Sequence, residues 1–185
     1  MKKITALILI LAMALSFTAC DESEGYQSNT REDNRGESPA SPSQENDPNG
    51  ASDYITIMGE QYGIDEPALN LNGLGLGDED IIPLKFMKNL ERLLMSGNNI
   101  SDITPLSGLT SLEILYLSEN SVSDISPLSG LINLKTLNLE NNEITDLTPL
   151  HGLSSLEYAN LSGNSFGDEQ IEALKTALPD CEFVF

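Results

Sequence analysis

The chain has 185 residues and a formal net charge of −20, because 29 acidic residues stand against only 9 basic ones. Its length suits one domain with accessory segments. The strong negative charge repels nucleic-acid phosphates and therefore excludes nucleic-acid binding. A basic protein partner or loosely held divalent cations are compatible with this charge, which by itself selects neither and also suits plain solvated surface.

The first 19 residues have the order of a secretory signal. Lys2 and Lys3 precede an apolar run from Ile4 to Phe17, and small residues follow it. Because about 20 apolar residues are needed to cross a bilayer, the run is too short for a comfortable membrane span. We therefore predict that residues 1–19 are a signal peptide that is removed.

The residues at the predicted cleavage site, Phe17-Thr18-Ala19-Cys20, resemble a bacterial lipobox, with Phe17 in place of the usual leucine. The resemblance implies that Cys20 becomes the mature N-terminus and carries a diacylglyceryl group in thioether linkage. Two acyl chains hold a protein at a membrane, since each buried CH₂ contributes about 0.8 kcal/mol. The alternative is an ordinary secretory signal that a cysteine follows by chance.

A polar segment comes next. Residues 21–52 contain no Val, Ile, Leu, Met or Phe, so they cannot bury enough apolar surface to offset chain entropy. We expect residues 20–52 to be a lipidated cysteine followed by a disordered acidic tether. As a flexible coil it would reach roughly 30 Å and space the folded domain from the membrane.

From residue 90 the chain repeats itself every 22 residues. The period is visible in three sets of equivalent positions, which are Leu90, Leu112, Leu134 and Leu156, then Asn98, Asn120, Asn142 and Asn164, then Asp102, Asp124, Asp146 and Asp168. A fixed period of this length is typical of a solenoid, in which each unit buries its apolar face only against its neighbours.

Each unit contains an alternating segment and then a turn signal. Leu115 and Leu117, for example, point to one face of a short strand, and stacked strands form a parallel sheet. The four asparagines follow the strands, where their amides can pair with backbone groups of adjacent coils as a structural ladder. Thr104-Pro105 and its equivalents read as an N-cap residue and the first proline of a helical turn. One aspartate per coil is interpreted as structural rather than as a metal ligand.

The segment before the regular units is irregular. We expect residues 53–89 to hold an N-terminal cap, with an opening strand from Tyr54 to Gly59, and a degenerate repeat. In that repeat Leu71 lies 22 residues before Leu93, so the frame of the later units is kept.

Three regular repeats are expected over residues 90–155, and a capping repeat over 156–185. Helical spacing of apolar residues predicts a helix from Asp168 to Leu178, which Pro179 ends. The final residues, CEFVF, are predicted to form a last strand.

The pattern LxxLxLxxN, continued by xIxDIxPLxxLxx, resembles the 22-residue leucine-rich repeat of bacterial internalins over about residues 53–185. The resemblance implies an α/β fold, namely a right-handed leucine-rich-repeat solenoid. A parallel sheet would line its concave side, short 3-10 turns its convex side, and a helix would cap its C-terminal end. It also implies a surface lipoprotein that binds through the concave face.

Carried onto this sequence, the resemblance places three columns of side chains on that face. They are Leu94, Tyr116, Asn138 and Asn160, then Arg92, Ile114, Thr136 and Tyr158, then Ser96, Ser118, Glu140 and Ser162. The repeat requires no apolar or aromatic group there, and aromatic residues are favoured in interface centres. We therefore predict partner binding at these residues; the alternative is that they merely cover the sheet.

No catalytic residue, metal site or cofactor is predicted. His151 occupies a variable position in a repeat turn, where Ser107 and Ser129 are its equivalents. Cys181 lies in the apolar ending and is expected to behave as a small buried hydrophobe. We accordingly predict a binding protein rather than an enzyme.

The predicted protein is a monomer, lipid-anchored at the extracellular face of the bacterial cell membrane, that binds a protein or a glycan in adhesion or envelope-protein interaction. One alternative is a regulatory or immunity-type lipoprotein that sequesters an envelope protein of its own cell. Another is solute capture for a transporter, although such domains are larger and enclose a cleft.

Overall fold

The computed structural model describes residues 53–185, which belong to one compact unit. The predicted signal peptide, Cys20 and the tether lie outside the described residues. Within residues 53–185 no helix is long and apolar enough to cross a bilayer.

An antiparallel hairpin opens the described part of the chain. Strands β1 (Tyr54–Ile57) and β2 (Glu60–Gly63) pair from Tyr54 with Gly63 to Ile57 with Glu60. Both turn residues, Met58 and Gly59, have positive φ, which is the geometry of the tight hairpin turns whose twist matches that of the strands. The opening strand was predicted. Its partner was not, because its residues EQYG lack apolar alternation.

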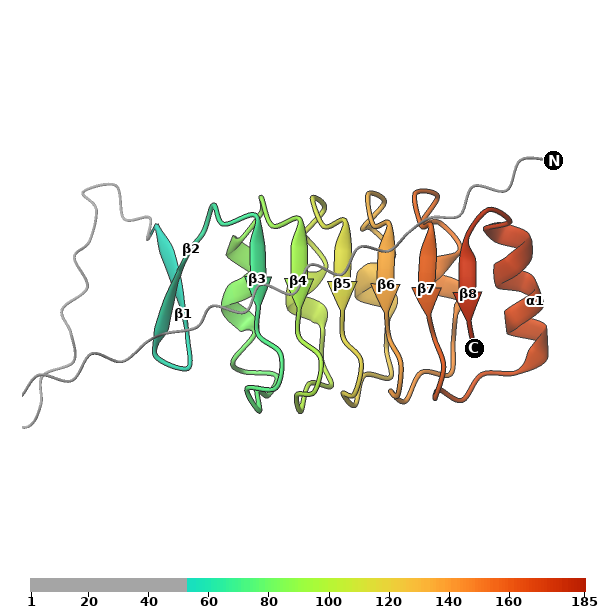
Figure 1. Cartoon of the computed structure of the whole chain (residues 1–185), viewed down its shortest axis with the longest axis horizontal. Coiled ribbons are helices and arrows are strands. Elements are labelled where there is room, and N and C mark those ends of the chain that lie inside the picture. The colour runs from blue at the N-terminus through green and yellow to red at the C-terminus, as the bar shows by residue number, and fades with distance from the viewer. Residues whose placement is uncertain (1–52) are drawn as a thin grey trace, which may run out of the picture. The chain divides into compact units, whose positions relative to one another are not determined.

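Six parallel strands form the main sheet in the order β3-β4-β5-β6-β7-β8, and they lie side by side in Figure 1. Their bounds are β3 (Ala68–Asn70), β4 (Arg92–Leu94), β5 (Ile114–Tyr116), β6 (Thr136–Asn138), β7 (Tyr158–Asn160) and β8 (Glu182–Val184). From β4 to β7 each residue pairs with the residue 22 positions later. The sequence period is therefore the step from one strand to the next.

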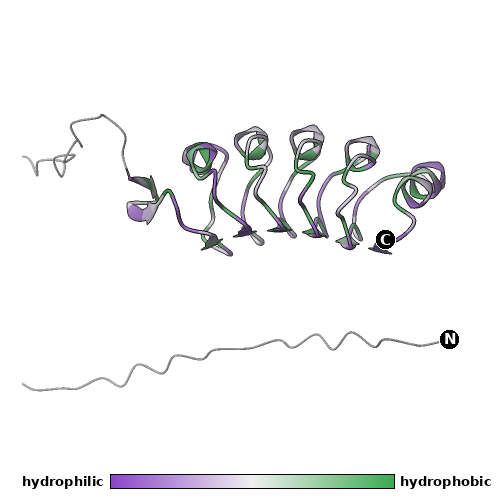
Figure 2. Cartoon of the chain, turned by 90° about the horizontal axis from the view of Figure 1, so that it is seen from above, coloured by the Kyte–Doolittle hydropathy of each residue, from purple (hydrophilic) through white to green (hydrophobic). Residues whose placement is uncertain are grey.

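Helical turns occupy the side opposite the sheet, as Figure 2 shows. They are the 3-10 helices η1 (Ile82–Phe86), η2 (Thr104–Leu106), η3 (Ser126–Leu128) and η4 (Thr148–Leu150), followed by α1 (Asp168–Ala177). A proline lies near the start of each 3-10 helix, where its fixed φ suits the helix and its missing N–H costs no bond.

The register of the first coil differs from the expected one. Leu69, and not Leu71, pairs with Leu93, so β3 is 24 residues from β4. In the second half of the coil the regular spacing of 22 returns. The Ile81 carbonyl accepts from the Leu84 N–H, just as the Ile103 carbonyl, 22 residues later, accepts from the Leu106 N–H. The two extra residues therefore lie between Leu76 and Ile81.

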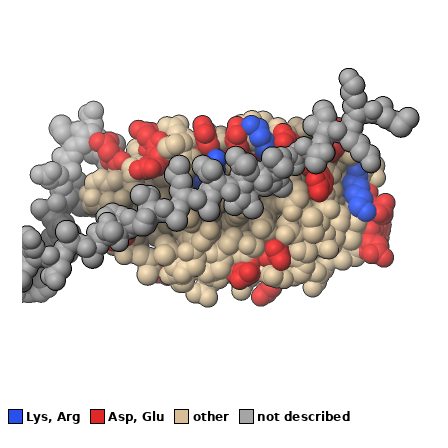
Figure 3. All heavy atoms as spheres, viewed as in Figure 1, with Lys and Arg blue, Asp and Glu red and all other residues tan. Residues whose placement is uncertain are grey.

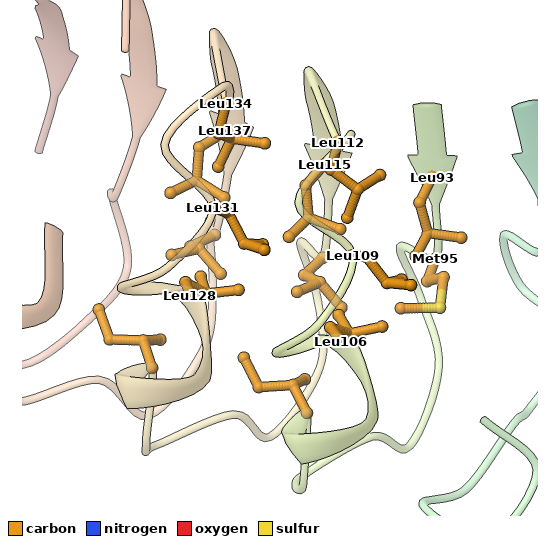
Figure 4. Packing of buried hydrophobic residues seen from close by; sticks show 14 of the residues in the cluster. Leu93, Met95, Leu106, Leu109, Leu112, Leu115, Leu128, Leu131, Leu134 and Leu137 are labelled. Atoms are coloured by element: carbon orange, nitrogen blue, oxygen red, sulfur yellow. The ribbon is translucent and has the colours of Figure 1, made fainter. Parts of the chain in front are cut away.

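The core runs through the interior of the solenoid between the sheet and the turns. Strand residues such as Leu115 and Leu137 meet Leu106 and Leu128 from the 3-10 helices, as Figure 4 shows, and all four are fully buried. Burying one leucine contributes about 1.5–3 kcal/mol relative to leaving it in water. The residues on either side of a buried leucine in a strand, such as Ile114 and Tyr116 beside Leu115, point away from the core to the outer face of the sheet.

Candidate functional site

The outward face of the main sheet carries all three predicted columns of side chains. Register places Arg92 opposite Ile114, then Thr136, then Tyr158 on successive strands. Two residues further along the same strands, register aligns a second column in the same way, namely Leu94, Tyr116, Asn138 and Asn160. Apart from exposed Arg92, these side chains are half-buried, and Figure 1 looks onto the face that they form.

The structure brings only some of the candidates together. Leu94 and Tyr116 are opposite each other on β4 and β5, and Ile114 shares their face two residues before Tyr116. Neighbouring strands are about 4.8 Å apart, so the three side chains adjoin. We call Leu94, Ile114 and Tyr116 the apolar cluster. Tyr158 lies on β7, with β6 between it and the cluster.

The polar candidates on β6 and β7 have partners within the chain. Asn138 Oδ1 accepts a hydrogen bond from the N–H of Glu140 at 3.0 Å. Asn160 Oδ1 accepts from the Ser162 N–H and hydroxyl, while Asn160 Nδ2 donates to Glu140 Oε2 at 3.1 Å. These hydrogen bonds stabilise the chain just after the strands. They leave fewer free donors and acceptors of Asn138 and Asn160 for a partner.

Asn72 was missed by the sequence reasoning, because the first coil was set in the wrong register. Its Oδ1 accepts a hydrogen bond from the N–H of Ser96 at 2.7 Å. The Ser118 hydroxyl in turn donates to the Ser96 hydroxyl at 2.8 Å. The first half of the third predicted column, Ser96 and Ser118, is thus joined by internal hydrogen bonds that start at Asn72.

A charged row runs along the edge where the strands begin. Glu91, Glu113, Lys135 and Glu157 occupy the position just before each strand. Lys135 Nζ lies 2.8 Å from Glu113 Oε2, and its bond to that carboxylate is the main cause that raises the pKa of Lys135. Figure 3 shows acidic groups along the edges of the visible part of this face and uncharged residues across its middle.

A shallow depression of about 200 Å³ adjoins the apolar cluster at this edge. It is lined by Pro67, Ala68, Glu91, Arg92, Glu113 and Ile114, which come from the starts of β3, β4 and β5. The depression is open to solvent and holds both signs of charge. It can accept a side chain but does not enclose a small molecule.

The four ladder asparagines bond backbone groups of two coils each. Asn120 Nδ2 donates to the carbonyls of Met95 and Leu117 at 2.9 and 3.1 Å, and its Oδ1 accepts from the N–H of Ile100. Asn98, Asn142 and Asn164 make the same three types of bond. The ladder lies inside the turn and is not available to a partner.

Aspartates, not the predicted threonine and serine residues, accept the first N–H groups of the 3-10 helices. Asp102 Oδ1 accepts from the N–H of Thr104 at 2.8 Å, and Asp124 and Asp146 accept likewise from the residue two positions on. Hydrogen bonds from Ser126 hold the pKa of Asp124 below its ordinary value. Thr104 and its equivalents therefore lie inside the helices, and the N-cap assignment was wrong by one residue.

No group of three or more His, Cys, Asp and Glu within residues 53–185 is placed to hold a metal ion. Burial raises the pKa of the Cys181 thiol to about 11, with a further contribution from Glu182, so the thiol stays protonated at neutral pH.

The convex side of the first coil has exposed apolar groups that the sequence reasoning did not single out. Ile82 and Phe86 of η1 are 45% and 59% exposed. Lys85 Nζ lies 5.1 Å from the centre of the Phe86 ring. The later coils have Gly108, Gly130 and Gly152 where Phe86 stands, a departure from the repeat that could have drawn attention to it.

Comparison with protein families identifies the repeat. A sequence model of two copies of the leucine-rich repeat matches residues 88–130, and a single-repeat model matches residues 133–153. The chain therefore contains leucine-rich repeats. Among curated proteins, none matches the sequence.

Solved structures of leucine-rich-repeat proteins superpose on the chain. An internalin from Listeria monocytogenes matches with a TM-score of 0.60 and 28% identity, over 68% of this chain and 37% of the internalin. A leucine-rich-repeat protein from Leptospira interrogans matches with a TM-score of 0.53 and 28% identity, over 56% of this chain and 27% of that protein. The chain thus spans well under two thirds of either relative.

These similarities confirm the predicted fold class. The chain forms a leucine-rich-repeat solenoid with a six-stranded parallel sheet, short 3-10 turns and one C-terminal helix, and its structure is similar to that of the Listeria internalin.

Proposed function

We propose that the chain is a cell-surface binding module that recognises a protein through the outward face of strands β3 to β8. One observation carries the proposal: Leu94, Ile114 and Tyr116 adjoin on this face, although Thr136 and Asn138 on β6 show that the repeat also folds with polar residues at these positions. Burying apolar and aromatic side chains is the main source of affinity in protein interfaces.

The dimensions of the face also favour a macromolecular partner. Six strands at about 4.8 Å spacing give a surface roughly 25 Å long. Solenoids present extended surfaces of this kind to their partners. The depression of about 200 Å³ is too open for a metabolite, which is held in concave pockets that bury most of the ligand.

We further propose that Cys20 carries a diacylglyceryl anchor, that residues 21–52 space the domain from the membrane, and that the domain faces the cell exterior. The Phe17-Thr18-Ala19-Cys20 sequence supports this proposal. Labelling cells with a palmitate analogue should mark the wild-type chain and not a Cys20→Ser variant. Equal labelling of the two would show that Cys20 is not the attachment site.

Affinity capture with matched variants tests the binding proposal. The full-length chain is used as bait against host-cell extracts and against the envelope fraction of its own cell. Leu94→Ala with Tyr116→Ala should lose the captured protein, and Tyr158→Ala reports whether β7 contributes. The control, Ile82→Ala with Phe86→Ala, removes apolar groups of similar size from the convex side and should retain it.

Each outcome assigns a role to a surface. A host protein lost only in the Leu94/Tyr116 variant would support adhesion. A protein of the cell's own envelope with the same dependence would support the regulatory alternative. Capture that is lost only in the convex control, or that no variant changes, would overturn binding through the sheet face.

A further inference from the structure

We propose that the segment bound by the sheet face is basic and apolar, and that it lies across β4 and β5 with a lysine or arginine over the edge where the strands begin. This inference rests on the proposed function, since it names the class of partner for the same face.

The apolar cluster fixes the centre of the contact. Leu94 and Tyr116 face each other across two strands, and Ile114 extends the cluster toward the strand starts. No hydrogen bond to a described residue involves the Tyr116 side chain, so its hydroxyl is free for a partner. A segment bound here gains by covering these three side chains with its own apolar groups.

The cluster is bounded on the β6 side by polar groups that are already satisfied. Asn138 and Glu140 are bonded to each other through the N–H of Glu140, and Glu140 also accepts from Asn160. Covering satisfied polar groups with apolar surface brings little gain. The contact is therefore expected to centre on β4 and β5 rather than to spread evenly along the sheet.

Unpaired negative charge surrounds the cluster. In the described part of the chain two ion pairs occur, Lys135 with Glu113 and Lys175 with Glu172. The other carboxylates at the two edges of the face are in neither ion pair, although Lys135 also attracts Glu91 and Glu157; they are Glu91, Glu157, Glu182, Glu119 and Glu140. Arg92 is the one cation on this face that neither pair uses.

The depression lies where the apolar cluster meets the charged edge of the sheet. Glu91 and Glu113 line it together with Ile114 of the apolar cluster. A lysine or arginine placed there can lay its apolar stem against Ile114 and its charge against Glu91, the lining carboxylate that neither ion pair uses. Arg92 lines the same depression and opposes such a residue, which makes Arg92 a position that tunes affinity.

The sign of the charge excludes the opposite partner. An acidic segment would approach the carboxylates of this edge and meet only Arg92 and Lys135 in compensation, of which Lys135 is already paired with Glu113. Rim charges act chiefly on association rate and on partner choice, so the edge glutamates favour basic partners before contact is made.

Selection of displayed random 12-residue peptides on the immobilised full-length chain tests the proposal. We expect the enriched peptides to carry a net positive charge together with aliphatic or aromatic residues. The dissociation constant of a synthetic copy is then measured against four variants. Leu94→Ala with Tyr116→Ala should weaken binding about tenfold or more, as expected for the centre of an interface.

The remaining variants report on charge. Glu91→Lys with Glu157→Lys should weaken binding several-fold, and Arg92→Glu should tighten it. All three positions are exposed, so folding is preserved. Ile82→Ala with Phe86→Ala on the convex side should leave binding unchanged.

The outcomes separate this inference from the proposed function. Enriched peptides that are neutral or acidic but depend on Leu94 and Tyr116 would overturn the basic partner and leave the sheet face as the binding surface. Peptides that depend on Ile82 and Phe86 alone would overturn both. A selection that enriches nothing would overturn the idea that the face takes a linear basic segment.

Discussion

The Asn142 side chain bonds the backbone of Val122 in the preceding coil: Asn142 Oδ1 accepts the N–H of Val122 at 3.0 Å. Its Nδ2 also donates to the carbonyls of Leu117 and Leu139 at 2.9 and 3.0 Å. One buried amide thus satisfies three backbone groups from two coils, where no water is available to replace it.

Replacing this amide should destabilise the fold strongly. Asn142→Ala leaves the buried Val122 N–H without a partner, which costs about 1–3 kcal/mol. It also removes one of the two bonds to each carbonyl of Leu117 and Leu139, which keep the bonds from Asn120 and Asn164. We expect a loss of about 3 kcal/mol in the free energy of unfolding measured with urea. Asn133 makes one exposed bond, to the Thr110 carbonyl, so Asn133→Ala should cost less than about 1 kcal/mol. Similar losses in the two variants would contradict the structural role of the ladder.

A glycine at position 119 should stabilise the domain. Glu119 has φ +56° at the point after the strand where other coils place Gly97 and Gly163, also with positive φ. A side chain in this region costs roughly 1 kcal/mol, so Glu119→Gly should gain about 0.5 kcal/mol after the entropy of glycine is counted. Glu143→Gly removes the same charge at a position without positive φ and should destabilise. A stability loss in both variants would count against strain at Glu119.

The sequence predicted the columns of the sheet face because the period of 22 residues carries them from strand to strand. It did not predict the register of the first coil. Side chains on a strand alternate, so a shift of two residues returns each one to the same face. From the sequence alone, either Leu69 or Leu71 could therefore pair with Leu93. The structure shows that the partner is Leu69.

The repeat pattern also did not predict which of the candidate side chains lie next to each other. The two tyrosines stood out equally in the sequence, yet Tyr116 meets Leu94 across β4 and β5 while Tyr158 is separated from it by β6. Internal bonding of Asn160 and Glu140 depends on side-chain conformation, which no period specifies.

Acid should weaken the three hydrogen bonds by which Asp78 joins the first two coils. Partial burial would raise the pKa of Asp78, but hydrogen bonds from the Asp102 N–H, the Ser101 hydroxyl and the Ser101 N–H outweigh it and leave the pKa below 3.8. A carboxylate with a lowered pKa stabilises the fold above its unfolded pKa, and this contribution is lost as pH falls through the folded value.

The free energy of unfolding should therefore fall more steeply below about pH 4 in the wild type than in Asp78→Asn. The variant should be the less stable protein at pH 6, and the difference between the two should shrink as the pH falls below 3.8. Curves that stay parallel throughout the acid range would contradict the lowered pKa of Asp78.

The Cys181 thiol should resist alkylation in the folded protein. Burial, assisted by the Glu182 charge, raises its pKa to about 11, and only the thiolate is nucleophilic. In a Cys20→Ser variant, iodoacetamide at pH 8 should label the native chain far more slowly than the urea-unfolded chain, and the native rate should still rise between pH 9 and pH 11. A native rate that levels off by pH 9 would contradict the raised pKa. A Glu182→Gln variant separates the two causes, since it removes the charge and keeps the burial, and it should lower the pKa by less than the full shift.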